Sequence, residues 1–369
     1  MGIFKSKNYR AIFLVGVGRK EPKTGGERSN RAIFDYLKTE FKSLEFVTER
    51  EPPRFIGIFA GRMNLVYFVL SNIRFLLSKS LCADILLIDF HMHPHLILRG
   101  LFKGDRSKWI AVIREAYNES THKFFWANRV LQSWFFRRMD ILVFNSYAVS
   151  NYYHQSFPNL PKSRVVYPGH DEVNSSLIKS RAKRSSKEQF QLLYVGLIRP
   201  IKGIHFMLQA MSYLKLPNWK LILAGDYSGD PIYFSKLKNI LERSNLDSKV
   251  IEFAGHLDRR ELNKLYLYSD VFILPSLFET YGQVIFEAAS FSLPIACSRT
   301  GALPEIIPEG CALFFNPEDP REIAKNIEKL YYSRDLMEKL SKKSEEILKG
   351  AISRKEMAKN FYKVISELF

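Results

Sequence analysis

VFILPSLFETYGQVIFEAAS, residues 271–290, contains the pattern that decides the fold. Its first part, Val271–Ser276, is an apolar run typical of a buried β-strand. Leu277–Gly282 follows as the loop at the carboxyl end of that strand, and from Gln283 onward a stretch rich in small residues predicts a helix. A strand, a loop and a helix in this order predict one unit of a parallel α/β sheet.

The same alternation extends along the whole chain and predicts two α/β halves, each with a doubly wound parallel sheet. The expected strands are Ala11–Val17, Ile85–Ile88, Trp109–Ile113, Ile141–Phe144, Val165–Tyr167, Leu192–Val195, Lys220–Ala224, Val250–Phe253, Val271–Leu274 and Pro294–Ala296. The expected helices are Arg28–Phe41, Leu65–Ser78, His205–Leu214, Pro231–Asn245, Arg259–Tyr268, Tyr281–Phe291 and Ser353–Phe369.

Residues 173–188 interrupt this alternation. They contain Ser, Lys and Arg with few large apolar residues, a composition typical of a linker. We therefore expect an N-terminal domain over residues 1–172 and a C-terminal domain over residues 189–352. Open parallel sheets bind ligands at the carboxyl ends of their strands, so the chemistry is expected in a central cleft that the two domains face.

The net charge points to an anionic partner. The chain has 369 residues with 55 Lys and Arg against 38 Asp and Glu, a formal net charge of +17. Residues 1–170 hold 26 of these cations and 13 of the anions, so the excess is concentrated in the first half. The charge alone does not distinguish between nucleic acid, anionic lipid and phosphorylated substrates as the partner. No nucleic-acid-binding motif accompanies the charge, which makes that class a distant alternative.

Cysteine usage and hydropathy indicate a cytoplasmic protein. Cys82, Cys297 and Cys311 show no paired spacing, which argues against disulfides and against a cysteine-ligated zinc site. The apolar run Ala11–Val17 leads into a glycine-rich loop and predicts a strand, not a signal peptide. The longest apolar region, residues 64–77, falls short of the roughly 20 residues that a membrane-spanning helix needs.

Three short motifs can hold a phosphorylated sugar. Glu279 and Glu287 bracket the predicted helix start, where carboxylates accept hydrogen bonds from vicinal hydroxyls and backbone amides bind phosphate. Gly196, Lys202 and Gly203 can form a pyrophosphate clamp, and Gly25-Gly26 precedes another helical pattern. The alternative interpretation is structural: helix caps, solvated cations, a flexible turn and a glutamate on a wet helix face.

His91, His93 and His95 alternate along an extended segment and suggest a zinc site. Pro94 interrupts the run, however, and no fourth ligand stands nearby. Because the segment follows the predicted strand Ile85–Ile88, contact with an acceptor is the better interpretation, and no metal site is predicted.

Together these motifs resemble the retaining GT-B glycosyltransferases of the Glu-x7-Glu family, the glycosyl transferases group 1, which act in lipid and polysaccharide assembly. The order and spacing of Gly25-Gly26-Glu27, of Gly196 with Lys202-Gly203, and of Glu279 with Glu287 match along nearly the whole chain. The runs Tyr167–Asp171 and Thr300–Glu305 are also similar to segments of that family. The resemblance implies a GT-B fold, with the terminal helix 353–369 packed back on the N-terminal domain.

The resemblance also implies roles for individual residues. Glu279 would contact the donor sugar, Glu287 the ribose, and Lys202 the diphosphate. Catalytic roles are expected for Glu279, Lys202, Arg199 and Arg114, and acceptor contacts for His91 and His93. The remaining donor-binding residues are expected to be Gly25, Gly26, Gly196, Gly203, Thr280, Tyr281, Gly282, Gln283 and Val284.

Two positions depart from the pattern of the family. Leu197 stands where the family usually has an arginine, and the nearest arginine is Arg199. Arg114 and Glu115 follow the strand Trp109–Ile113, where the family often has a histidine near the donor sugar. The sugar preference that this histidine carries therefore cannot be transferred to this chain.

The resemblance predicts a retaining, metal-independent hexosyltransferase that uses a UDP or GDP sugar and no cofactor. The acceptor would be lipid-linked or a polysaccharide, as in lipopolysaccharide assembly, and the basic first half would contact the anionic inner face of the cell membrane. A soluble glycosyltransferase and a nucleotide-sugar epimerase of the same architecture are the alternatives. No nucleic-acid partner is expected.

Overall fold

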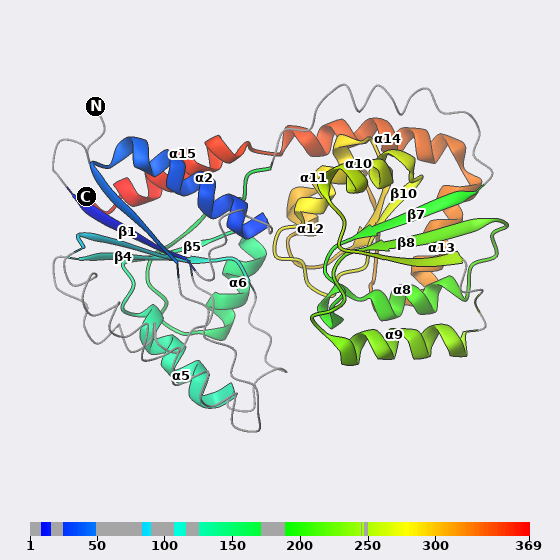
Figure 1. Ribbon diagram of the computed structural model, residues 1–369, viewed down its shortest axis with the longest axis horizontal. Helices are drawn as coiled ribbons and strands as arrows, with labels where there is room; N and C mark the ends of the chain where they lie inside the picture. The colour runs from blue at the N-terminus through cyan, green and yellow to red at the C-terminus, as the bar shows by residue number, and fades with distance from the viewer. Residues whose placement is uncertain are drawn as a thin grey trace. The chain divides into compact units, whose positions relative to one another are not determined.

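The computed structural model describes residues 9–15, 25–48, 83–89, 107–115, 125–170, 189–244, 246 and 250–369. The chain divides into two compact units (Figure 1). The first combines residues Met1–Gly169 with Ile352–Phe369, and the second is His170–Ala351. The predicted helix Leu65–Ser78 and the predicted linker 173–188 lie outside the described residues.

The first unit contains a parallel six-stranded sheet in the order β2-β1-β3-β4-β5-β6. Figure 1 shows α2 and α15 over one face of this sheet and α5 and α6 over the other. The strands are β1 Arg10–Val15, β2 Ser43–Thr48, β3 Ile85–Asp89, β4 Lys108–Ile113, β5 Ile141–Phe144 and β6 Ser163–Val165. The helices are α2 Gly25–Glu40, α5 Phe125–Phe136, α6 Tyr147–Ser156 and α15 Arg354–Ser366.

The last helix of the chain completes the core of this first unit. Apolar residues of α15, among them Phe361 and Ile365, are buried against Ile33 and Leu37 of α2. Gly169 lies against the start of α15 so closely that a Cβ atom there would be 2.4 Å from the Cα of Arg354. Burying two such side chains contributes about 2 kcal/mol each relative to exposure, so α15 is an integral part of this unit.

The second unit contains a parallel six-stranded sheet in the order β12-β11-β10-β7-β8-β9. In Figure 1, α8, α9 and α13 lie on one face of it and α10, α11 and α14 on the other. The strands are β7 Phe190–Val195, β8 Trp219–Ala224, β9 Ile251–Gly255, β10 Val271–Leu274, β11 Ile295–Ser298 and β12 Leu313–Phe315. The helices are η3 Pro200–Lys202, α8 Ile204–Met211, α9 Pro231–Arg243, α10 Arg259–Tyr268, α11 Gln283–Ser290, α12 Leu303–Ile306, α13 Pro320–Tyr332 and α14 Arg334–Lys349.

These two parallel sheets confirm the predicted α/β class. The observed bounds of the elements differ from the predicted ones by a few residues. For example, α11 starts at Gln283 because its cap, Gly282, has a left-handed φ of 90° that helical residues do not adopt. The sequence pattern does not predict the edge strands β2 and β12 or the helices α5, α6, α12, α13 and α14. Both of these strands are partly exposed, which weakens their apolar pattern. In contrast, α13 carries Ile323, Ile327 and Leu330 at helical spacing and could have been predicted.

Candidate functional site

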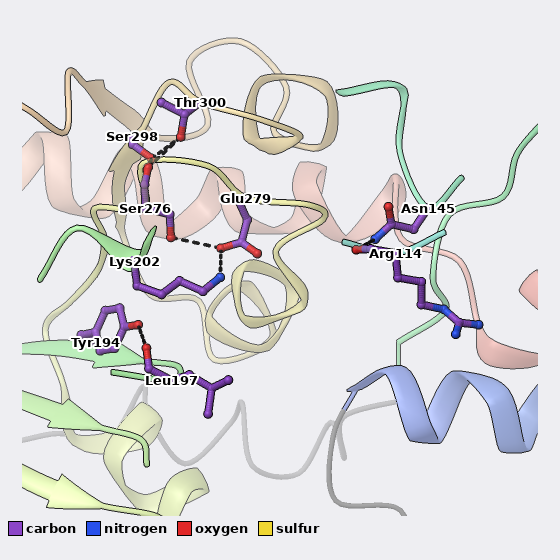
Figure 2. Close-up of polar contacts among 9 residues, drawn as sticks. All are labelled: Arg114, Asn145, Tyr194, Leu197, Lys202, Ser276, Glu279, Ser298 and Thr300. Atoms are coloured by element: carbon purple, nitrogen blue, oxygen red, sulfur yellow. Dashed lines mark hydrogen bonds and ion pairs between the residues drawn. The ribbon is translucent and has the colours of Figure 1, made fainter. Parts of the chain in front are cut away.

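The loop after β10 holds a buried carboxylate. Glu279 is only 7% exposed, and its Oε2 atom lies 2.7 Å from the Nζ of Lys202 and 3.0 Å from the Oγ of Ser276. Figure 2 shows both side chains converging on the carboxylate. A carboxylate removed from water requires such partners, because desolvation of an unpaired charge costs several kcal/mol. The contact pairs two of the predicted catalytic residues and adds Ser276, which the sequence motifs did not single out.

The backbone of this loop is held by the loop after β11. The amide of Ala302 donates to the carbonyl oxygen of Glu279 at 2.8 Å. Ser298 and Thr300 place their hydroxyl oxygens 2.6 and 2.7 Å from the carbonyl oxygen of Ser276 (Figure 2). Gly301 allows this approach, since a Cβ atom there would lie 2.1 Å from the carbonyl oxygen of Glu279. The position of Glu279 is therefore determined by two adjacent loops.

The turn after β7 carries Lys202 to this carboxylate. The amide of Leu277 donates to the carbonyl oxygen of Ile201 at 2.8 Å, which joins the turn to the β10 loop. Gly203 caps η3 and α8 with a left-handed φ of 66°, and a Cβ atom there would lie 2.0 Å from the carbonyl oxygen of Pro275. Only glycine tolerates both conditions without strain. Gly203 thus lets the turn approach closely enough for the ion pair.

Leu197 and Arg199 lie in the same turn, in different surroundings. The carbonyl oxygen of Leu197 accepts a hydrogen bond from the hydroxyl of buried Tyr194 at 2.9 Å, while its side chain is 52% exposed (Figure 2). Burial and the nearby charge of Glu279 raise the pKa of Tyr194, which keeps this phenol a donor. Arg199 donates to the carbonyl oxygen of Gly229 at 2.6 Å, in the loop after β8. Its catalytic role stays a prediction.

The residues between the two glutamates form the start of α11. Gly282 is its N-cap, Gln283 and Val284 open its first turn, and Thr280 and Tyr281 belong to the preceding loop. The first amides of a helix have no partner within the helix and carry partial positive charge. Tyr281 is 4% exposed and stacks on Phe286, which fixes the loop at the point where it enters the helix.

Glu287 occupies the second turn of α11 and has two partners, both from α10. Its Oε1 atom lies 2.7 Å from the Nη1 of Arg259, and its Oε2 atom accepts from the hydroxyl of Tyr266 at 3.0 Å. The side chain is 17% exposed. Neither partner was singled out by the sequence motifs, because α10 carries no local signal for a contact with α11.

His205 is a titratable group at the start of α8, close in sequence to Lys202. Its Nδ1 atom lies 2.9 Å from the hydroxyl oxygen of Tyr233. Burial, followed by the charge of Lys236, lowers the pKa of His205 to about 4. The imidazole is therefore neutral at pH 7 and adds no charge to this helix start.

Arg114 of the first unit is held in a polar cluster where β3, β4 and β5 end. Its Nη1 atom lies 2.5 Å from Oδ1 of Asp89, whose Oδ2 atom accepts from the side chain of Asn30. The side-chain amide of Asn145 donates to the carbonyl oxygen of Arg114 at 3.0 Å (Figure 2). With side-chain exposures of 10% and 2%, Arg114 and Asp89 form a buried ion pair, which fixes the direction of the guanidinium.

The other predicted residues of the first unit have a less complete description. Gly25 and Gly26 are the first two residues of α2, so the predicted glycine turn is part of the helix itself. His91 and His93 lie outside the described residues. Within the described ranges, no three His, Cys, Asp or Glu side chains are grouped so that they could hold a metal ion. None of the helices described here is both long and apolar enough to cross a membrane.

Comparison with known proteins shows a similarity between most of the second unit and one family. Residues 177–347 match the family Glycosyl transferases group 1. Sulfoquinovosyl transferase SQD2 of Arabidopsis thaliana is 30% identical over 176 residues, which are 47% of this chain and 32% of that protein. Glycogen synthase of Mycobacterium tuberculosis is 29% identical over 183 residues, 49% of this chain and 42% of that protein. The chain spans about a third to three fifths of the length of such curated relatives.

Solved structures resemble nearly the whole chain. A sucrose-phosphate synthase from Thermosynechococcus elongatus has a TM-score of 0.74 at 16% identity and covers 98% of this chain and 99% of its own. Anabaena HepE in complex with UDP and glucose has a TM-score of 0.72 at 18% identity and covers 97% of this chain and 99% of its own. The chain therefore has the GT-B fold, and residues 177–347 are similar to the family Glycosyl transferases group 1.

Proposed function

We propose that this protein is a retaining glycosyltransferase that moves a hexose from a nucleoside diphosphate sugar to a lipid-linked or polysaccharide acceptor. The observation that carries the proposal is the contact between Lys202 and Glu279 inside the region similar to the family Glycosyl transferases group 1. It joins a cation suited to a diphosphate with a carboxylate suited to sugar hydroxyls, next to the start of α11. The UDP and UDP-glucose bound by HepE support a nucleotide-sugar donor.

In this proposal, the leaving diphosphate is stabilised by charges already fixed in the second unit. Lys202 moves from Glu279 to the diphosphate, and the amides of Gln283 and Val284 face the same negative charge. Arg199 supplies further positive charge in place of the family arginine absent at Leu197. Such prearranged donors favour the transition state, where charge on the leaving group is largest, and they supply the neutralisation that a metal provides elsewhere.

Glu279, released from Lys202, accepts hydrogen bonds from hydroxyls of the donor sugar, and Glu287 accepts from the ribose. Gly196 and Gly203 shape the clamp turn. The acceptor is assigned to the first unit, where Arg114 provides a fixed donor for an anionic or hydroxyl group, and Gly25 and Gly26 open α2. His91 and His93 remain predicted acceptor contacts.

A thermal-shift screen tests the donor assignment. UDP, GDP and ADP, each free and as the glucose or mannose conjugate, are added at about 100 times their dissociation constants. One nucleotide series is expected to stabilise the protein by about 2.7 kcal/mol and to raise the unfolding temperature by several degrees. Lys202→Met is expected to reduce that rise, because it removes a diphosphate partner. No shift with any of these nucleotides would contradict the proposal.

The products distinguish transfer from epimerisation. Transfer releases a free nucleoside diphosphate together with a glycosylated acceptor, whereas an epimerase changes the sugar and leaves it free or on the nucleotide. The contact between Lys202 and Glu279 is compatible with both reactions. The similarity to the family Glycosyl transferases group 1 favours transfer.

We further propose that the enzyme acts at the anionic inner face of the cell membrane, from the cytoplasmic side. The charge excess of residues 1–170 supports this, as do exposed groups on α5 and directly after it. Val130 is 52% exposed, and exposed Arg138 lies 5.4 Å from the ring of Trp134 beside exposed Arg137. Anionic lipid attracts each basic residue near its surface by about 1 kcal/mol.

Vesicle sedimentation tests the membrane assignment. The protein is expected to pellet with vesicles containing phosphatidylglycerol at low salt and to stay in solution with pure phosphatidylcholine. Replacing Arg137 and Arg138 by Glu is expected to lower the vesicle-bound fraction. Arg334→Glu, a charge reversal at a highly exposed site of the second unit, serves as the matched control. If anionic vesicles bind no protein at low salt, the membrane assignment is wrong.

A further inference from the structure

Tyr266 is a fully buried residue of α10 whose hydroxyl reaches into α11. It has a relative exposure of 0%, and the hydroxyl donates to Oε2 of Glu287 at 3.0 Å. Among the described residues, this carboxylate is the one polar partner of the phenol. Because burial of a hydroxyl without a partner is unfavourable, the contact is expected to persist in solution.

The position of this hydroxyl is fixed by the packing of the ring. Tyr266 stacks on Phe291, with ring centroids 5.3 Å apart and planes 11° from parallel. Phe272 of β10 also contacts the ring of Tyr266, with the two ring centroids 6.0 Å apart. Burial and the charge of Glu287 raise the pKa of Tyr266, so the phenol stays protonated and can only donate to the carboxylate.

The second oxygen of Glu287 is held from the same helix. Arg259, 41% exposed on its side chain, lies 2.7 Å from Oε1. Arg259 begins α10, whose start is fixed by a capping box between Asp258 and Glu261. Each carboxylate oxygen therefore has one partner from α10, and an ionised carboxylate offers about four acceptor positions. One acceptor position on each oxygen is left, which is the requirement for binding two adjacent hydroxyls.

We propose that Tyr266 is a positioning residue that orients the Glu287 carboxylate toward the 2′- and 3′-hydroxyls of the donor ribose, with Arg259 supporting the other oxygen. The proposal rests on the ribose role of Glu287 in the proposed function. Packing alone does not explain a tyrosine at this position, because a phenylalanine ring fills nearly the same space. The hydroxyl is explained by its hydrogen bond to Glu287. The hydroxyl adds selectivity for ribose over deoxyribose.

Binding of ribo- and deoxyribonucleotides to Tyr266→Phe tests this role. Affinities of UDP, GDP and ADP and of their 2′-deoxy forms are measured by calorimetry for the wild type and the variant. For the nucleotide that binds, we expect about tenfold weaker binding of the ribose form to the variant and a smaller loss for the deoxy form, which keeps only the 3′-hydroxyl. Equal loss for both forms, or no loss for either, would overturn the proposal.

Control variants separate this proposal from a folding defect. Tyr268→Phe removes a hydroxyl from an exposed position of the same helix and is expected to leave the selectivity unchanged. Arg259→Gln alters a side chain that is 41% exposed, and it is expected to reduce ribose selectivity in the same direction. If Tyr266→Phe does not fold, unchanged selectivity in Arg259→Gln overturns the proposal.

Nucleotide binding by the wild type distinguishes failure of the proposed function from failure of the role proposed for Tyr266. If it binds none of the nucleotides, the proposed function fails and this inference fails with it. If it prefers ribose to deoxyribose and Tyr266→Phe keeps the full preference, the proposed function stands and the role of Tyr266 is wrong.

Discussion

Glu279→Gln is expected to lower kcat by about 10²- to 10³-fold, the usual loss when one prearranged polar contact to a reacting group is removed. The glutamine side chain has the same size but lacks the negative charge that pairs with Lys202. Only one of its two terminal atoms, the oxygen, can accept a hydrogen bond from a hydroxyl. Release of nucleoside diphosphate from the nucleotide sugar identified by the thermal-shift screen measures the effect.

The same substitution is expected to leave the affinity for the free nucleoside diphosphate unchanged or higher. In the wild type, the ammonium of Lys202 must leave Glu279 before it can pair with a phosphate. Removal of the carboxylate charge makes this exchange easier, since an ammonium 23% exposed then has no anionic partner among the described residues. Glu309→Gln, at an exposed position outside the site, is the matched control and is expected to retain wild-type kcat. Full activity in Glu279→Gln would rule out the donor-site assignment.

Gly203→Ala is expected to destabilise the second unit by at least about 3 kcal/mol. The left-handed conformation at a φ of 66° costs an alanine about 1–2 kcal/mol. The added Cβ would also lie 2.0 Å from the carbonyl oxygen of Pro275, so the turn after β7 must move away from the loop after β10. Urea unfolding followed by circular dichroism measures the loss, and the midpoint is expected to fall with an unchanged slope.

Gly310→Ala provides the matched control for this contact. Gly310 has a similar φ of 73°, but its nearest neighbour is the flexible end of Lys343, 3.3 Å from the added Cβ. This variant is expected to lose only the conformational part, about 1–2 kcal/mol. Equal destabilisation by the two substitutions would show that the close approach of Gly203 to Pro275 contributes nothing.

In addition, Gly203→Ala is expected to weaken nucleotide binding, because Lys202 moves with the turn.

Local residue patterns were sufficient to predict the fold class. Val271–Leu274 carries four consecutive apolar residues, and all four are buried in β10. Such runs reflect burial of a strand on both faces, and this is a property of each segment by itself. The same holds for the glycines of the clamp turn, because a left-handed φ excludes most side chains. The α/β class and the units with strongly apolar strands could therefore be predicted residue by residue.

Contacts between loops could not be predicted in the same way. Lys202 follows β7 and Glu279 follows β10, and they meet because these two strands are neighbours in the sheet order β12-β11-β10-β7-β8-β9. Thr300 reaches Ser276 because β11 lies on the other side of β10. Strand order depends on how crossover helices pack, which no local pattern of residues records.

The sequence by itself determined the two α/β halves and the types of residue in the proposed donor site. The tertiary structure alone decided the partners of those residues. Arg199 contacts the loop after β8, Arg114 pairs with Asp89, and Glu287 is held by Tyr266. The physical reason is that periodicity depends on burial within one segment, whereas an ion pair or a hydrogen bond depends on distances of about 3 Å between segments far apart in the chain.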